Sequence, residues 1–84
     1  MMEFIETGIE TDSQTAEKDG RIAFNGYIYL KENGEDCEVS CKFLYDKQTG
    51  AVDIECNDNE VLSLFEYEIK QDAEQNIRIN AEVA

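Results

Sequence analysis

The sequence predicts a mainly β protein, built as a single antiparallel meander of five to six strands or as a small barrel made from the same strands. Two observations support this prediction. Apolar and polar residues alternate from Arg21 onward, which is the period of a strand with one buried face. Turn residues interrupt the alternation at short intervals, first at Asn33-Gly34 and then at residues 47–50. A chain of 84 residues is expected to form a single domain, 1–84.

Residues 1–20 show no clear period. Their apolar positions are Phe4, Ile5 and Ile9, and a polar stretch runs from there to Gly20. We expect this segment to be irregular, or to form a short N-terminal strand followed by a loop. The meander proper is expected over residues 21–83.

A β-hairpin is the strongest local prediction. Asn33-Gly34 is typical of a two-residue type I′ turn, which needs positive φ at both central positions. Such a turn sets Glu32 opposite Glu35 and fixes every other pair in the hairpin. The apolar pairs that result are Leu30–Cys37, Ile28–Val39, Gly26–Cys41, Phe24–Phe43 and Ile22–Tyr45, and the opposite-charge pairs are Lys31–Asp36 and Arg21–Asp46.

A third strand is expected over residues 52–56. The loop at 47–50 would set Tyr45 opposite Val52, Phe43 opposite Ile54 and Cys41 opposite Cys56. All three cysteines, Cys37 included, then point into the apolar face, and buried thiols are the favoured interpretation. A Cys41–Cys56 disulfide is the alternative. Three cysteines without any histidine do not suit a zinc site, so we expect no metal and no cofactor.

Two structures compete for residues 59–83. As strands over 59–71 and 76–83, Asp58-Asn59 forms a turn, and the facing pairs are Cys56–Val61, Val52–Phe65, Ile69–Ile77, Tyr67–Ile79 and Phe65–Ala81. As a helix at 59–74, the fold becomes α+β, in the order βββαβ, with the helix packed on the sheet. Asn57 would then cap a stripe of Val61, Leu62, Phe65 and Ile69, but Glu68 and Asp72 project near that stripe. The strands are the preferred prediction because of these two acids.

The charge restricts the partners. Twenty acidic residues against seven basic ones give a formal charge of −13. This charge repels phosphate and anionic lipid, so no direct binding to nucleic acid or to membrane surfaces is expected, and a basic protein is the favoured partner. The acidic N-terminal residues do not resemble a signal peptide and no apolar run is long enough to span a membrane, which predicts a cytoplasmic protein.

No catalytic pattern is present. The chain has no histidine, and it lacks the G-x-S-x-G, P-loop and G-x-G-x-x-G motifs. Pairs of carboxylates are common in so acidic a chain, but they act as a catalytic dyad only in a shared pocket. We therefore expect a protein that is not an enzyme.

The candidate binding site is a cluster of acids at one end of the meander. Alternate turns of a meander lie at the same end, which would gather Glu32, Glu35, Asp36, Asp58 and Glu60. The outer face of the sheet is expected to carry Tyr27 and Tyr29, where they could anchor a protein interface. It is also expected to carry eight acids and five bases, namely Asp36, Glu38, Asp46, Asp53, Glu55, Glu66, Glu68 and Glu82, with Arg21, Lys31, Lys42, Lys70 and Arg78.

These features favour a small protein-binding domain that inhibits or modulates a basic nucleic-acid-handling or toxin-like protein. Nucleic-acid mimics of phages and immunity proteins of bacteria are of this general type, although no motif here matches one of their families. The alternative is an assembly module that forms a homodimer through its sheet face or edge. A small-ligand barrel is a third hypothesis, which we rank last because so few strands would fill their interior with side chains.

Overall fold

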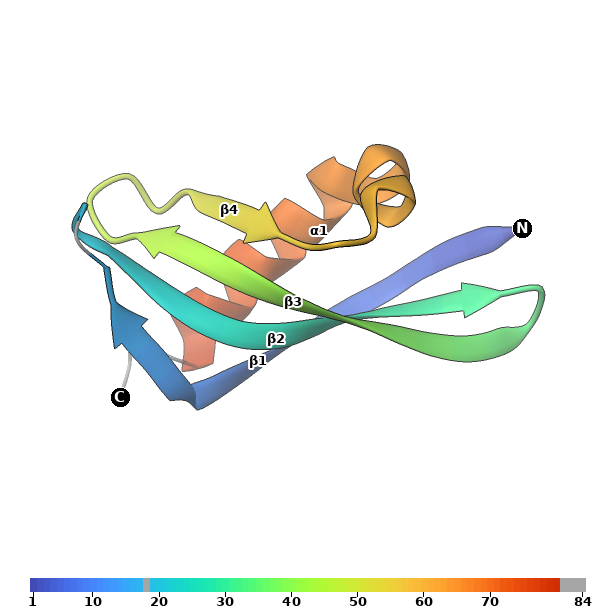
Figure 1. Ribbon diagram of the computed structural model, residues 1–84, viewed down its shortest axis with the longest axis horizontal. Coiled ribbons are helices and arrows are strands. Elements are labelled where there is room, and N and C mark those ends of the chain that lie inside the picture. Colours follow the sequence, from blue (N-terminus) through green and yellow to red (C-terminus); the bar gives the residue numbers. More distant parts are fainter. Residues whose placement is uncertain (18, 81–84) are drawn as a thin grey trace.

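The chain folds as an open four-stranded antiparallel sheet with one helix across one face (Figure 1). The computed structural model describes residues 1–17 and 19–80. The strands follow each other in sequence order, so β1 and β4 form the two edges of the sheet. The elements are β1 (Met2–Ala16), β2 (Arg21–Glu32), β3 (Glu35–Asp46), β4 (Val52–Glu55) and α1 (Asn59–Asn80). A mainly β, antiparallel fold is confirmed, whereas a five- to six-stranded meander and a closed barrel are wrong for the residues described.

The β2–β3 hairpin has the predicted register. Asn33 and Gly34 both have positive φ, 54° and 84°, as a type I′ turn requires. All twelve pairs from Arg21–Asp46 to Glu32–Glu35 are formed as the turn predicts. The β3–β4 register is also as predicted, with Tyr45 opposite Val52. However, β4 has only four residues and ends at Glu55, just before the expected Cys41–Cys56 pair.

The N-terminal segment differs from the expectation of an irregular region or a short strand. β1 is the longest strand, with 15 residues, and it pairs with β2 along most of its length. The register shifts twice, between Phe4 and Glu6 and between Glu10 and Thr15. Each shift changes which residues face the core, because side chains in a strand alternate between faces. The two irregularities therefore explain why no period is visible in this part of the sequence.

Residues 59–80 form α1, so the strands predicted over 59–71 and over 76–80 are wrong. The rest of the last predicted strand, residues 81–83, lies outside the described residues. The helix alternative is correct in kind, but α1 continues beyond residue 74 to Asn80 and the expected βββαβ order becomes ββββα. Asp58, rather than Asn57, caps the helix, because its Oδ1 accepts a hydrogen bond from the Val61 amide at 3.1 Å. The helix is kinked at Phe65, where φ is −129° and ψ is 17°.

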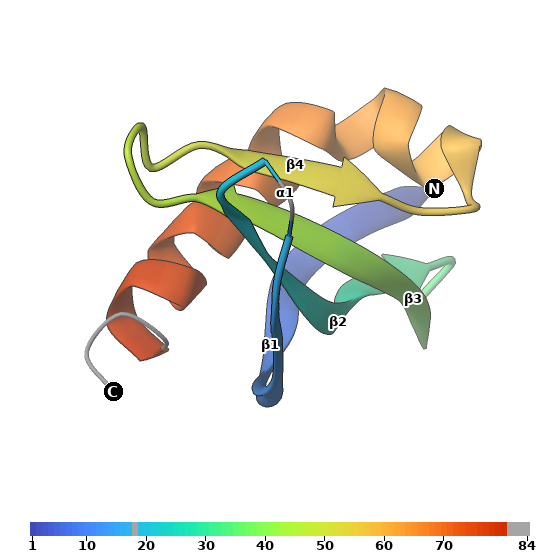
Figure 2. The same ribbon diagram turned by 60° about the vertical axis from the view of Figure 1, so that its left-hand side comes forward.

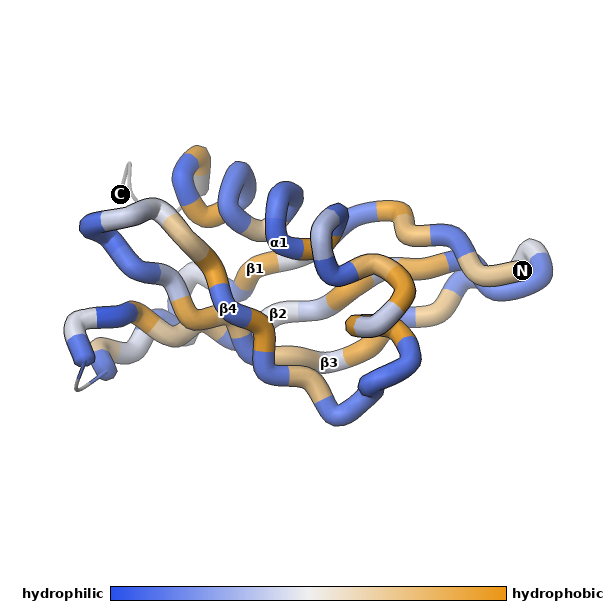
Figure 3. Tube along the Cα trace, turned by 90° about the horizontal axis from the view of Figure 1, so that it is seen from above, coloured by the Kyte–Doolittle hydropathy of each residue, from blue (hydrophilic) through white to orange (hydrophobic). Residues whose placement is uncertain are grey.

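The apolar face of α1 covers the inner face of the sheet (Figures 2 and 3). It carries apolar residues at intervals of four, and these sit among inward-facing side chains of β2, β3 and β4. Figure 3 shows α1 on one side of the sheet, along strands in which apolar and polar residues alternate. The helical members of the core are Val61, Ile69, Ala73 and Ile77, and the partly buried Phe65 packs against them.

A polar contact fixes α1 to the edge strand β1. Asp72 Oδ2 accepts hydrogen bonds from the Thr7 amide at 2.7 Å and from the Thr7 hydroxyl at 2.8 Å. One turn further along the helix, Asn76 Nδ2 donates to the Thr7 carbonyl at 3.0 Å. Two side chains of α1 thus bond the main chain of Thr7 as a neighbouring strand would. Asp72, which counted against a helix, is one of the two residues that bond the helix to β1.

The described part of the chain contains no helix that is both long and apolar enough to cross a membrane.

Candidate protein-binding face

The five predicted acids occupy two separate places. Glu32, Glu35 and Asp36 are exposed around the tip of the β2–β3 hairpin, where they line a shallow hollow of about 320 Å³. Asp58 and Glu60 lie at the start of α1, and Asp58 is occupied in capping the helix.

The link from β4 to α1 meets β3 short of the hairpin tip. The Cys56 thiol donates to the Ser40 carbonyl at 3.9 Å, so the link lies beside β3 at Ser40. Asp36 lies four residues further along β3, or about 13 Å at the usual rise of a strand. The five acids therefore divide between the hairpin tip and the start of α1.

A different group of acids meets on the outer face of the sheet, the face opposite α1. Tyr29 on β2 lies between Glu6 of β1 and Glu38 of β3. Tyr27, the next outward residue of β2, lies between Gly8 and Ser40. Glu10 occupies the following row of β1. We call this surface the tyrosine face and define it as Glu6, Gly8, Glu10, Tyr27, Tyr29 and Glu38.

The two tyrosine rings are positioned by their neighbours. Their centroids are 6.2 Å apart and the ring planes are inclined by 32°. The Tyr29 ring lies over Gly8, where a Cβ atom would come within 2.9 Å of Tyr29 Cε2. The Tyr27 hydroxyl donates to Glu10 Oε1 at 3.1 Å. Gly8 thus gives Tyr29 room to lie across β1, and both half-buried rings are oriented before any partner arrives.

The electrostatics of this face are negative. The hydrogen bond from Tyr27 to the Glu10 carboxylate raises the pKa of the tyrosine, and the charges of Glu10 and Glu38 add to this effect. Among the described residues the ion pairs are Arg21 with Asp19 and Asp53, and Lys70 with Glu66. None of these involves Glu6, Glu10 or Glu38. Lys31 and Lys42 border the face in the adjacent rows, and neither forms an ion pair with another described residue.

The outer face predicted from the sequence was correct only for the strands. Tyr27, Tyr29 and Glu38 point outward as expected, because the hairpin register is as expected. Glu66, Glu68, Lys70 and Arg78 instead belong to α1, and Glu82 lies outside the described residues. Glu6 and Glu10 were missed because no register was assigned to the possible strand within residues 1–20. The signal that could have revealed them is the series Phe4, Thr7 and Ile9, once a bulge at Ile5 is allowed.

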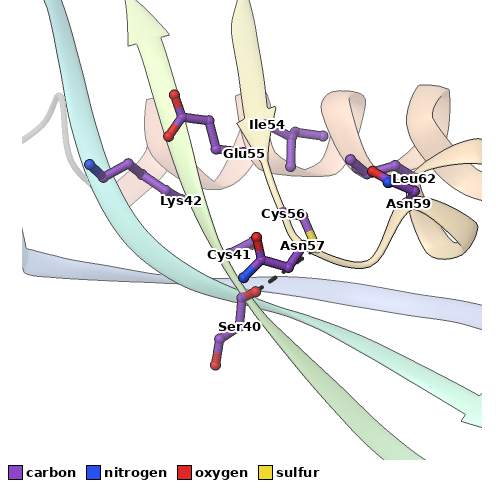
Figure 4. A pocket seen from close by; sticks show the side chains of 9 residues that line it. All are labelled: Ser40, Cys41, Lys42, Ile54, Glu55, Cys56, Asn57, Asn59 and Leu62. Atoms are coloured by element: carbon purple, nitrogen blue, oxygen red, sulfur yellow. Dashed lines mark hydrogen bonds between the residues drawn. The ribbon is translucent and has the colours of Figure 1, made fainter.

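Cys41 and Cys56 line a groove at the point where β4 leaves β3 (Figure 4). All three cysteines are free and half-buried, in line with thiols packed against the core and not with the disulfide alternative. Burial, together with the nearby Cys56 sulfur, raises the pKa of Cys41 to about 12. The described residues include no group of three or more cysteine, aspartate or glutamate side chains arranged to hold a metal ion.

Comparison with known protein families, with characterised proteins and with solved structures finds no match to this chain.

Proposed function

We propose that this chain is a small acidic protein-binding domain that inhibits or modulates its partner by covering a basic surface, with the tyrosine face as the contact. The observation that supports this proposal is the pair of pre-oriented tyrosines, with Glu6, Glu10 and Glu38 beside them and no base of the described residues bonded to these acids. Function is assigned to the tyrosine face in place of the five acids expected from the sequence.

The two kinds of residue would act in different ways. Tyrosines give a large contact area at a small entropic cost and are enriched among the residues that dominate binding energies. The rings also accept lysine or arginine side chains against their faces. The carboxylates would speed association with a basic partner and select against acidic ones.

The partner class follows from the overall charge. With a formal charge of −13, the chain repels nucleic acid itself and attracts proteins that bind nucleic acid or carry a similar basic surface. A nucleic-acid-handling or toxin-like protein fits this description. Occupation of its basic surface would block whatever that surface binds.

Self-assembly has less support. An uncovered apolar sheet face was the main reason to expect a homodimer, and α1 covers that face. Two copies would also bring together surfaces of like charge, which costs free energy unless salt screens it.

The test is a capture experiment with matched variants. The protein is immobilised and exposed to lysate, and the affinity of the captured partner is then measured for Tyr29→Ala and for the control Tyr67→Ala. Tyr67 is 69% exposed on α1, far from the tyrosine face. We expect Tyr29→Ala to weaken binding about 30-fold, which corresponds to about 2 kcal/mol for a dominant interface residue.

Tyr67→Ala should leave the affinity within about twofold of the unmodified protein. Glu38→Gln and the exposed helical Glu68→Gln form a second matched pair, and only Glu38→Gln should reduce the salt dependence of binding. Equal losses from Tyr29→Ala and Tyr67→Ala would remove the tyrosine face from the proposal.

A further inference from the structure

One edge of β3 is left without a neighbouring strand. β4 pairs with β3 only from Lys42 to Tyr45, although β3 begins at Glu35. Figure 1 shows β3 continuing to the hairpin tip well past the end of β4. From that side, the only bond that the described residues give to positions 36–40 is the one between the Cys56 thiol and the Ser40 carbonyl.

The hairpin turn determines which main-chain groups face this edge. A type I′ turn joins Glu32 and Glu35 by a hydrogen bond, and hydrogen-bonded pairs then recur at every second residue. Cys37 and Val39 therefore bond to β2. The amide and carbonyl groups of Asp36 and Glu38, and the amide of Ser40, point away from β2 toward the free edge. The Cys56 contact on the Ser40 carbonyl fits this alternation.

The opposite edge of the sheet is covered at one position, Thr7, whereas positions 36 and 38 of β3 have no such cover among the described residues. On β1, the main-chain groups of Thr7 that point outward are bonded by Asp72 and Asn76. Exposed strand edges are sites where another chain can add a strand, and proteins commonly cover or charge them. Nothing in the described part of the chain covers Asp36 or Glu38.

The side chains beside the free edge differ between the two faces of the sheet. Asp36 and Glu38 are exposed on the outer face, whereas Cys37 and Val39 are half-buried on the inner face beside the core. A strand added here would place alternate residues beside the acids and the others beside the apolar pair. The matching segment alternates basic and apolar residues.

We propose that residues 36–40 of β3 bind an extended segment of the protein partner by β-strand addition, with lysine or arginine on the outer face and apolar residues on the inner face. The basic character of the segment rests on the proposed function, whereas the availability of the edge does not. Main-chain hydrogen bonds would supply affinity and the alternating side chains would supply specificity.

A second copy of the chain fits the edge poorly. Antiparallel pairing of two β3 edges centred on Glu38 would set the Glu38 carboxylates against each other, and like charges in directly opposed positions are destabilising. A basic segment would instead neutralise Asp36 and Glu38.

The added strand has a defined end. At Ser40 the link from β4 to α1 comes to lie beside β3, and a groove of about 660 Å³ opens there (Figure 4). Ser40 and Cys41 of β3, Cys56 and Asn57 of the link, and Leu62 of α1 line this groove. A segment of about five residues would run along the free edge, and its end would reach the groove.

The direct test uses a synthetic peptide on the isotope-labelled protein. The capped peptide Lys-Val-Lys-Val-Lys is titrated at low salt, and amide hydrogen exchange is followed by NMR. We expect saturable binding that slows exchange at Asp36 and Glu38 at least tenfold, with little change at Cys37 and Val39, which already bond to β2. The capped peptide Lys-Lys-Lys-Val-Val, with the same composition, should not protect these amides. Equal protection by both peptides, or none at millimolar concentrations, would overturn the proposal.

Two variants separate the edge from its charge. Glu38→Pro removes the amide that faces the edge, and proline is tolerated on edge strands. Glu38→Gln removes the same charge and keeps the amide. We expect Glu38→Pro to weaken peptide binding at least tenfold more than Glu38→Gln, and equal losses would contradict strand addition.

Two further controls keep the outcome unambiguous. If circular dichroism shows that Glu38→Pro is unfolded, the peptide is compared instead with its form N-methylated at the main-chain amides, and both are titrated on the unmodified protein. Equal affinity of the two peptides would contradict strand addition. Tyr29→Ala separates this proposal from the previous one. If the peptide binds at the edge and Tyr29→Ala leaves the affinity for the captured partner unchanged, the tyrosine face alone is refuted. If the peptide does not bind and Tyr29→Ala weakens the affinity for the partner, the edge alone is refuted.

Discussion

Replacement of Asp72 by alanine should destabilise the protein more than any other single change on the polar side of α1. Asp72 Oδ2 accepts from the Thr7 amide, the Thr7 hydroxyl and Asn76 Nδ2, at 2.7, 2.8 and 3.2 Å. Hydrogen bonds to a charged group contribute about 1.5–3 kcal/mol each, but these three share one oxygen and do not add. Thr7 is only 5% exposed, so its amide would be left unpaired away from water. We expect a loss of about 2–4 kcal/mol.

Urea unfolding followed by circular dichroism measures this loss. A domain of this size has about 4–12 kcal/mol of total stability, so the change would be large and still measurable. Gln75→Ala is the matched control, because Gln75 is exposed on the same helix and should change stability by less than about 0.5 kcal/mol. The double variant with Thr7→Val should lose less than the sum of the two single changes. Equal effects of Asp72→Ala and Gln75→Ala would refute the view that this contact holds α1 on the sheet.

Three further outcomes are expected. Gly26→Ala should lower the free energy of unfolding, measured by urea titration, by about 1–3 kcal/mol, because the added Cβ would clash with the Gly8 carbonyl and lie 2.6 Å from the Phe43 ring. An unchanged free energy of unfolding would contradict this packing. In an ultraviolet titration the pKa of Tyr27 should fall toward its ordinary value in Glu10→Gln, and an unchanged pKa would show that the hydrogen bond is absent. The Cys41 thiol should react slowly with thiol reagents at pH 8 until the protein unfolds, because its pKa in the folded protein is about 12. The free energy of unfolding should also fall as pH rises from 9, the ordinary pKa of a thiol, toward 12, since between these values the thiol ionises only in the unfolded chain.

The hairpin could be predicted because a local signal determines it. Asn33-Gly34 requires a turn of defined geometry, and two residues then set the partner of every residue from Arg21 to Asp46. The outward direction of Tyr27 and Tyr29 follows from the same turn. The outward direction of Glu38 follows from it as well, whereas Glu6, Gly8 and Glu10 were not predicted, because the shift at Ile5 depends on how β1 pairs with β2.

The helix was ranked second to the strands for a reason that lies in its spacing. Val61, Phe65 and Ile69 are four residues apart, and residues four apart share a face in a strand as well as in a helix. The residues between them distinguish a helix from a strand. Ser63, Tyr67 and Gln71 would be buried in a strand, and in the structure all three are exposed. The use of Asp72 to bind Thr7 is a tertiary contact that no local pattern indicates.

The contact between Thr7 and Asp72 also has a consequence for synthesis of the chain. The two residues are 65 positions apart, so β1 emerges from the ribosome long before the helical turn that protects its edge. The hairpin of β2 and β3 can form meanwhile from near neighbours in sequence, whereas closure of so long a loop must wait for α1. A nascent chain stalled before residue 72 would therefore expose both the inner face of the sheet and the edge of β1, and would be a substrate for chaperones or a seed for aggregation.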